Sequence, residues 1–81
     1  MLDIKILGPN CSKCSELEKL CREAVTENGI EANIEKVTDY KKIAVYNVML
    51  TPALVINGKV VHYGSVPTKP NLITMLMNAM V

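Results

Sequence analysis

The spacing of hydrophobic and polar positions changes several times along this chain, and each change marks the start of another predicted element. Residues 3–7 are short, β-branched and partly alternating, which predicts a strand that ends at a Gly-Pro-Asn turn. From residue 12 the apolar positions recur at spacings of three and four, which predicts an amphipathic helix closed by Asn28-Gly29. Residues 30–37 alternate again and indicate a half-buried or edge strand. Strand, helix and strand in this order are typical of a parallel βαβ unit.

The second half of the chain predicts a helix, a hairpin and a last helix. Asp39 is a suitable N-cap for a helix whose inward side chains we expect to be Tyr40, Ile43, Ala44 and Val48. The apolar runs at 53–56 and 59–63 flank Asn57-Gly58, which is a strong hairpin signal. Thr68 can cap a final helix with the apolar side chains Leu72, Ile73, Leu76, Met77 and Met80. The predicted order is therefore β-α-β-α-β-β-α.

Composition limits the class of protein. The 81 residues are 49% hydrophobic without Trp or Phe, so we expect one globular domain, residues 1–81, with an aliphatic core. Nine basic and eight acidic residues give a formal charge of +1 and form no basic patch, which argues against nucleic acid as a partner. No apolar run approaches the ~20 residues that span a bilayer, and the first residues carry charges where a signal peptide would be apolar. We therefore expect a cytoplasmic monomer that does not bind membranes.

The three cysteines carry the candidate chemistry. Cys11 and Cys14 lie at positions i and i+3 of a predicted first helical turn, where Cβ atoms are ~5–6 Å apart, so a small adjustment joins or separates their sulfurs. Cys21 lies two helical turns beyond Cys14, ~10.5 Å along the axis, which is too far for a disulfide within an intact helix. Cys21 is therefore predicted to fill the core.

Cys11 is the predicted nucleophile. At the start of a helix, unpaired N–H groups and the positive end of the helix dipole favour a thiolate, and Lys13 adds a positive charge. We expect a Cys11 pKa of roughly 6.5 to 7.5, which suits thiol-disulfide exchange. Cys14 lies one turn inside the helix, where we expect its sulfur to be buried and protonated, and it would act second. The spacing alone leaves a redox pair, a metal-binding pair and an inert pair open.

A second signal lies far along the chain. Thr51-Pro52 precedes the predicted hairpin, and a C-x-x-C before the first helix together with T-P or V-P before the third strand is the pairing seen in thioredoxin-fold oxidoreductases. Over nearly its whole length the sequence resembles this superfamily, and most closely the small glutaredoxin-like thioredoxins of archaea and bacteria. The resemblance implies an α/β fold of the order βαβαββα, with a four-stranded mixed sheet flanked by three helices.

The resemblance also implies an activity and a set of site residues. Cys11 and Cys14 would be catalytic, and the chain would reduce disulfides in other proteins with no cofactor beyond the Cys11–Cys14 couple. Pro52 would be cis and face the nucleophilic sulfur, and Thr51 would offer its backbone to an extended substrate. The two residues between the cysteines, Ser12 and Lys13, are expected to contact the substrate.

Three departures from the family pattern bear on the electron donor and on the thiols. Residues 63–66 carry no carboxylate to hold the amine of glutathione, and Ser12-Lys13 replaces the usual aromatic residue between the cysteines. These departures argue against glutathione as the direct reductant and favour a flavoprotein of the thioredoxin-reductase type. Lys5 stands roughly where thioredoxins carry a buried acid, so it would either favour thiolates or extend its ammonium group to solvent.

Two other functions remain open. Two thiolates alone can bind Cu(I) or Zn, so the chain could be a soft-metal carrier. Copper chaperones place a Met two residues before the first Cys, whereas Pro9 and Asn10 precede Cys11 here. It could also be a thioredoxin-like module that binds a partner without catalysis. His62 and the methionines of the last helix have no ligand spacing and are predicted to serve the surface and the core, respectively.

Overall fold

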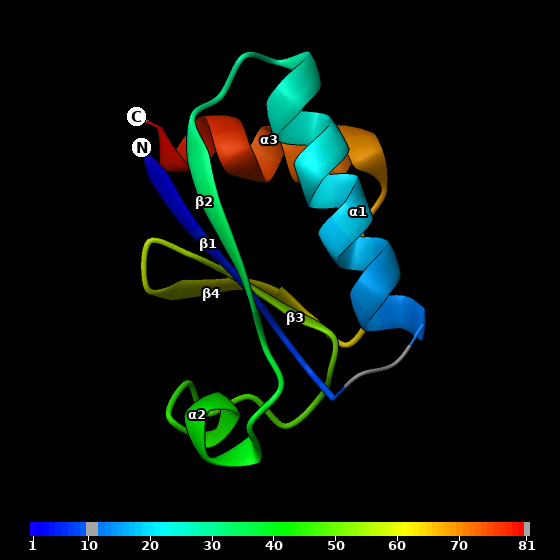
Figure 1. The fold of residues 1–81 in the computed structure, drawn as a ribbon, viewed down its shortest axis with the longest axis vertical. Helices are drawn as coiled ribbons and strands as arrows, with labels where there is room; N and C mark the ends of the chain where they lie inside the picture. Colours follow the sequence, from blue (N-terminus) through cyan, green and yellow to red (C-terminus); the bar gives the residue numbers. More distant parts are fainter. Residues whose placement is uncertain (10–11, 81) are drawn as a thin grey trace.

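The computed structural model describes residues 1–9 and 12–80 and shows the predicted order of elements (Figure 1). Helices are α1, α2 and α3, and strands are β1 to β4. Their bounds are β1 Leu2–Leu7, α1 Ser12–Glu27, β2 Ala32–Val37, α2 Tyr40–Ala44, β3 Ala53–Ile56, β4 Lys59–Tyr63 and α3 Lys69–Ala79. The α/β class and the element order predicted from the sequence are therefore confirmed.

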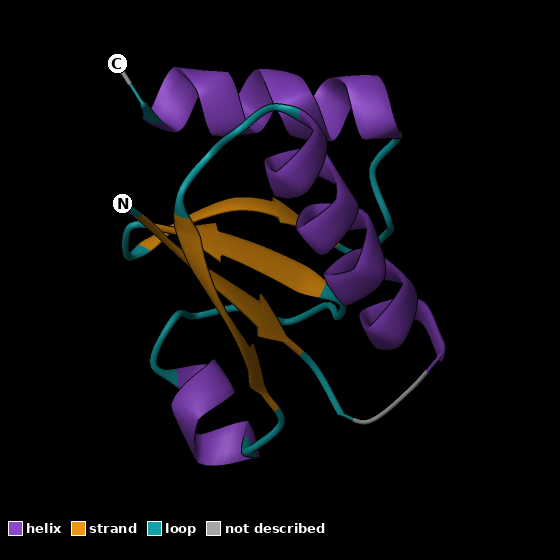
Figure 2. Cartoon of the chain, turned by 45° about the horizontal axis from the view of Figure 1, so that its top comes forward, coloured by secondary structure: helices purple, strands orange, loops and turns teal. Residues whose placement is uncertain are grey.

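The strands form one four-stranded mixed sheet in the order β2-β1-β3-β4 (Figure 2). β1 pairs in parallel with β2, from Leu2 opposite Ala32 to Leu7 opposite Val37. β1 pairs antiparallel with β3, and β3 pairs antiparallel with β4. The parallel pair needs a crossover connection, which α1 supplies, whereas the antiparallel pair β3-β4 needs only a tight turn.

The two central strands divide the molecule into two layers. Side chains alternate between the faces of a strand, so Ile4 and Ile6 lie on the face covered by α1 and α3, and Leu7 lies on the face covered by α2. In both ribbon views α1 and α3 lie against each other on one side, and α2 stands apart near one end of the sheet (Figures 1 and 2). The sheet is thus covered fully on one face and partly on the other.

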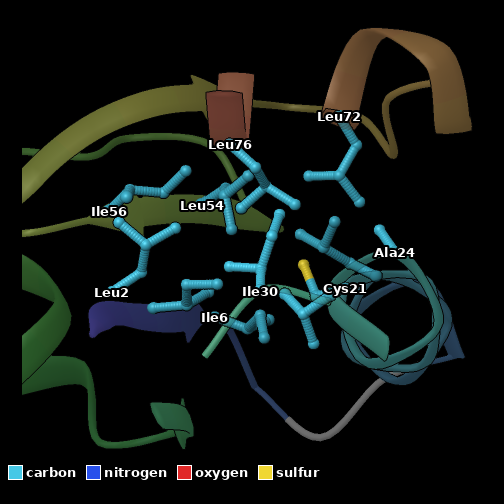
Figure 3. Close-up of a cluster of buried hydrophobic side chains, with 12 residues drawn as sticks. Leu2, Ile6, Cys21, Ala24, Ile30, Leu54, Ile56, Leu72 and Leu76 are labelled. Atoms are coloured by element: carbon cyan, nitrogen blue, oxygen red, sulfur yellow. The ribbon is translucent and has the colours of Figure 1, made fainter. Parts of the chain in front are cut away.

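The larger core lies between the sheet and helices α1 and α3 (Figure 3). Its buried members are aliphatic apart from one cysteine: Leu2, Ile4, Ile6, Leu17, Cys21, Ala24, Val25, Ile30, Leu54, Ile56, Leu72 and Leu76. The predicted helical spacing of α1 supplies four of these residues: Leu17, Cys21, Ala24 and Val25. At ~25 cal/mol per Å² of buried apolar surface, this layer provides most of the hydrophobic stabilisation.

A smaller core lies under α2 on the other face, and it corrects one expectation. Its buried residues are Leu7, Val37, Ile43, Ala53 and Val55. Asp39 caps α2 as predicted, because its side chain accepts a hydrogen bond from Lys41 N. Tyr40 and Ala44, however, are exposed rather than inward. A helix of five residues completes little more than one turn, so it turns only Ile43 fully into the core.

The hairpin and α3 follow their local signals. Asn57 and Gly58 both have positive φ, 52° and 81°, as a type I′ turn requires. The side chain of Thr68 accepts a hydrogen bond from Asn71 N at the start of α3. Leu72 and Leu76 are buried as expected. The remaining predicted apolar residues of α3 are less enclosed: Ile73 is half-buried, and Met77 and Met80 are exposed. In residues 1–9 and 12–80 no helix has the length and apolarity to cross a bilayer.

Candidate active site

Three segments that are far apart in sequence meet at one end of the sheet. β1 ends at Leu7 and leads into Gly8, α1 begins at Ser12, and Thr51-Pro52 leads into β3. The antiparallel register of β1 and β3 places Ala53 opposite Leu7, so Thr51-Pro52 enters the sheet where β1 leaves it. The sheet topology therefore brings the residues that flank both sequence motifs together.

Gly8 lies between Cys14 and Thr51. A Cβ atom added to Gly8 would overlap the Sγ atom of Cys14 and would lie 3.7 Å from Cys14 Cβ and 3.4 Å from Thr51 Cβ. Both side chains therefore pack around the same backbone atom, and glycine is the residue that permits this close approach. The predicted sulfur at position 14 and the predicted substrate-binding position 51 are thus neighbours.

The structure describes only one of the two candidate cysteines, Cys14. Cys14 lies in the first turn of α1 and is fully buried, as predicted for the residue that acts second. Cys11 lies outside the described residues, so its predicted thiolate remains a prediction. Ser12 and Lys13 open α1 with exposed side chains, on the helical turn that also holds Cys14.

The peptide bond between Thr51 and Pro52 is cis, which confirms the conformation implied by the resemblance. Pro52 is buried and Thr51 is exposed. The pairing of β1 with β3 ends at Leu7 and Ala53, so the peptide groups of Thr51 lie beyond the paired part of the ladder. Thr51 is therefore an exposed residue outside the paired part of the β1-β3 ladder, close to a buried sulfur.

The loop that follows β4 contacts both Pro52 and Leu50. The backbone N–H of Gly64 donates a hydrogen bond of 2.9 Å to the carbonyl oxygen of Pro52. A Cβ at Gly64 would lie 3.4 Å from Leu50 Cδ1, so the loop after β4 also packs against the residue before Thr51. His62 Nε2 lies 3.1 Å from Ser65 Oγ in the same loop, which is a surface contact as predicted. These contacts fix the entry of β3 between two loops.

The start of α1 lies in a positively charged environment. The first turn of α1 contains no acidic residue, and Lys13 lies within it. Lys36 on β2 donates a hydrogen bond of 3.3 Å from Nζ to Ser15 Oγ in the same turn. Sequence reasoning missed Lys36, although the alternation of β2 places it on the same face as Ile34. Positive charge beside a helix N-terminus favours thiolates there.

Lys5 is engaged by carboxylates on the α2 side of the sheet. Its Nζ atom lies 3.1 Å from Asp3 Oδ2 and 3.7 Å from Glu35 Oε2. The hydrogen bond that Lys5 Nζ donates to Asp3 Oδ2 is the main cause that raises the pKa of Lys5. Two partly exposed acids compensate the charge of Lys5, so the geometry favours an ion pair near the surface over a role in favouring thiolates.

Cys21 belongs to the core and not to the site. Figure 3 shows its sulfur among the aliphatic side chains between α1, α3 and the sheet. Burial raises the pKa of the Cys21 thiol to about 12, with a smaller contribution from Glu18. The thiol therefore stays protonated and unreactive at neutral pH, as predicted from its helical position.

Three exposed apolar side chains lie close to Thr51 in the chain or in the β3-β4 ladder, and they were not singled out from the sequence as part of the site. Met49 is 94% exposed, Leu50 57% and Tyr63 60%. Leu50 is adjacent to Thr51, and Tyr63 lies opposite Ala53 in the β3-β4 ladder. We call Met49, Leu50 and Tyr63 the apolar rim. A sequence signal existed, because Met49-Leu50 directly precedes Thr51-Pro52 without any polar residue between them.

The described residues offer little to a metal ion. Within 1–9 and 12–80 no group of three or more His, Cys, Asp or Glu side chains is arranged to hold one. Closed structural zinc sites generally have four ligands. A soft-metal site that uses Cys11 lies outside these residues and stays untested.

Comparison with known proteins gives a consistent family. Residues 2–77 match the model of a family described as a thioredoxin domain. The chain is 36% identical over 72 residues to a thioredoxin of Methanothermobacter thermautotrophicus, covering 89% of this chain and 94% of that protein. It is 38% identical over 68 residues to a thioredoxin of Methanocaldococcus jannaschii, covering 84% of this chain and 78% of that protein.

Solved structures support the same fold. The germline-specific thioredoxin Deadhead of Drosophila melanogaster superposes with a TM-score of 0.68 at 16% identity, covering 95% of this chain and 79% of that one. The oxidised thioredoxin of Plasmodium falciparum gives a TM-score of 0.65 at 15% identity, covering 99% and 82%. With a family match over nearly the whole length and two archaeal relatives above 35% identity, this chain belongs to the thioredoxin family of protein disulfide oxidoreductases.

Proposed function

We propose that this chain reduces disulfides in other proteins through a Cys11–Cys14 dithiol/disulfide couple. The observation that supports this most strongly is the position of Gly8, which contacts both the Cys14 sulfur and Thr51. A buried sulfur at the start of a helix thus lies close to an exposed residue that precedes a strand. This arrangement is suited to holding an extended segment of a substrate next to a reactive thiol.

The exchange proceeds in two steps. The Cys11 thiolate attacks one sulfur of the substrate disulfide, which forms a mixed disulfide and releases the other substrate sulfur as a thiolate. Cys14, after losing its proton, then attacks Cys11 Sγ. The Cys11–Cys14 disulfide forms and the second substrate sulfur leaves. Two electrons pass to the substrate, and no other cofactor takes part.

The surroundings of the pair have separate roles. Ser12 and Lys13 face solvent beside the cysteines and contact the substrate, and Lys13 with Lys36 favours the thiolate form of Cys11. Thr51 offers its backbone to an extended segment, and Pro52 leaves that backbone unpaired by the sheet. The apolar rim then contacts side chains that flank the substrate cysteine.

The partners follow from the same features. The substrates are disulfide-containing proteins, and the electrons return from a flavoprotein of the thioredoxin-reductase type rather than from glutathione. The loop at 63–66 has no acid to bind the glutathione amine. We expect the chain to act as a cytoplasmic monomer without nucleic acid or membrane partners.

The experiment compares two disulfides of different size. The fully reduced protein is mixed with insulin or with glutathione disulfide under the same conditions, and the thiols formed are counted. We expect one insulin disulfide reduced per molecule of protein, and at least ~10-fold slower reaction with glutathione disulfide, since ~1.4 kcal/mol of docking energy corresponds to tenfold. The Cys21→Ser variant is the matched control and should retain the activity. Equal rates with both disulfides, or loss of activity in Cys21→Ser without loss of folding, would contradict the proposal.

A further inference from the structure

Met49 is the most exposed large hydrophobic side chain among residues 1–9 and 12–80. Its exposed fraction is 94%, against 41% for Met77 in α3 and 56% for Met80, the C-cap residue of α3. An exposed methionine gains little from packing, and its thioether is open to oxidants in solution. The position of this side chain therefore matters more for chemistry than for stability.

The place of Met49 in the fold connects it with the site. It lies in the loop between α2 and β3, adjacent to Leu50 and three residues before Pro52. Leu50 packs against Gly64, and the N–H of Gly64 donates a hydrogen bond to Pro52. The thioether is therefore part of the apolar rim, on the segment that holds Thr51.

We propose that Met49 is an oxidation site at which a peroxide weakens the docking of protein substrates. This inference rests on the proposed function. In the reaction the thioether sulfur attacks one oxygen of hydrogen peroxide, an S–O bond forms, the O–O bond breaks and water leaves. The sulfur loses two electrons and the peroxide gains them, so no further reactant is needed.

The sulfoxide changes the rim without changing the sulfurs that react. It replaces an apolar, flexible side chain by a polar one. When a substrate covers the rim, the sulfoxide oxygen loses its bound water, and this costs binding free energy unless the substrate offers a hydrogen-bond donor. We expect KM for a protein disulfide to rise ~3–10-fold while kcat changes little, since binding is weakened and the exchange step is not. A small disulfide that does not cover the rim should react as before.

The other methionines provide internal controls. Met1 is 87% exposed but precedes Leu2, at the end of β1 remote from Gly8, so it should oxidise alongside Met49 without affecting docking (Figure 1). Met77 lies on α3 and Met80 is its C-cap residue, on the fully covered side of the sheet. Met75 is only half-buried but also belongs to α3. Oxidation at any of these positions is expected to leave KM unchanged.

The experiment uses the whole protein in its disulfide form, so that the cysteines are protected. Hydrogen peroxide is added, sulfoxides are located by peptide mass spectrometry, and the disulfide is then reduced before the assay. Reduction of insulin is compared with reduction of the small aromatic disulfide DTNB. The Met49→Gln variant imitates the polar side chain without peroxide, and Met49→Leu and Met80→Leu are treated in parallel.

Each outcome decides the inference. We expect Met49 to oxidise faster than Met75 and Met77, the insulin KM to rise, and the DTNB rate to stay constant. Met49→Gln should show the raised KM untreated, Met49→Leu should have the same KM before and after peroxide, and Met80→Leu should respond like the wild type. A fully formed Met49 sulfoxide with unchanged insulin KM would overturn the inference. Failure of the untreated wild type to reduce insulin would instead overturn the proposed function, while the oxidation rates would still be measured.

Discussion

The two faces of the sheet differ in how they are covered, and the site lies at their boundary. Two long helices, α1 and α3, bury twelve of the described residues on one face, whereas α2 buries five on the other. Cys14 comes from the well-covered face, because it belongs to α1. Thr51-Pro52 comes from the loop that follows α2. The rigid layer therefore holds the sulfur, and the thinly covered layer carries the segment that would meet the substrate.

The largest effect should come from the well-covered face. Leu76 is fully buried between α3 and the sheet. Leu76→Ala removes its contacts and leaves a cavity that α1 and the sheet cannot close, so we expect a loss of ~3–5 kcal/mol of unfolding free energy. Urea denaturation followed by circular dichroism measures it. A loss below ~1 kcal/mol would mean that this layer is far less tightly packed than described.

The next effect lies at the boundary itself. Gly8→Ala places a Cβ against the Cys14 sulfur at the end of β1, where neither the strand nor α1 can easily shift. We expect a loss of ~2–3 kcal/mol and a clear fall in disulfide-exchange rate.

Gly29→Ala is the matched control for that substitution. Gly29 has a φ of +62° but nothing within 4 Å of an added Cβ, so it tests the backbone effect without the contact. We expect it to cost ~1 kcal/mol and to leave exchange unchanged. Equal effects of both variants on the exchange rate would show that the contact between Gly8 and Cys14 has no functional importance.

A smaller loss of stability is expected on the thinly covered face. Ile43 is the buried residue of α2. Ile43→Ala should cost ~2 kcal/mol, the low end for such a change, because a one-turn helix at the surface can settle into the space. Hydrogen exchange should increase mainly at Ala53 and Val55, the residues of β3 that pack beneath α2. An even increase across α1 and α3 would argue that the two layers unfold as one unit.

The smallest effect is a pH dependence within the well-covered face. The buried Cys21 thiol has a pKa of about 12 in the folded protein and about 9 when unfolded. Between these values the unfolded chain binds fewer protons than the folded one, so stability falls as pH rises, by at most ~1.4 kcal/mol per pH unit.

The measurement compares the wild type with Cys21→Ala between pH 8 and pH 10.5. Lysines and tyrosines titrate in both proteins, so the difference in slope reports Cys21. We expect the wild type to lose stability more steeply above pH 9, and native Cys21 to resist iodoacetamide at pH 8. Identical slopes would show that the thiol is not buried as described.

The parts of the structure that were predictable are those with local signals. The spacing of Leu17, Cys21 and Ala24 identified α1, and Asn57-Gly58 identified the hairpin turn. The exposure of Tyr40 was not predictable, because a helix of five residues is too short for apolar positions to recur along it. Met77 was wrongly predicted to face the core for a related reason. Because α3 is covered on one side only, it buries fewer residues than its apolar composition suggests.

The motifs of the candidate site were visible in the sequence, but the contacts between them were not. The cysteine spacing and Thr51-Pro52 stood out as motifs, and the structure brings Cys14 and Thr51 together. Gly8 was read as a turn residue, because only the β1-β3 pairing shows that a sulfur and a threonine approach its backbone. Lys36 was missed because its contact with Ser15 crosses from β2 to α1. Contacts of this kind depend on the register of the sheet and have no local signature.

The central claim is that a thiol at position 11 attacks protein disulfides beside Thr51 and that Cys14 resolves the product. The most direct measurement is covalent trapping with the Cys14→Ser variant, followed by mass spectrometry of the linked peptides. The account predicts a disulfide between Cys11 and a cysteine of the substrate protein, released by dithiothreitol and absent in Cys11→Ser. Adducts that form equally in Cys11→Ser, or a wild-type protein that reduces no protein disulfide, would contradict it.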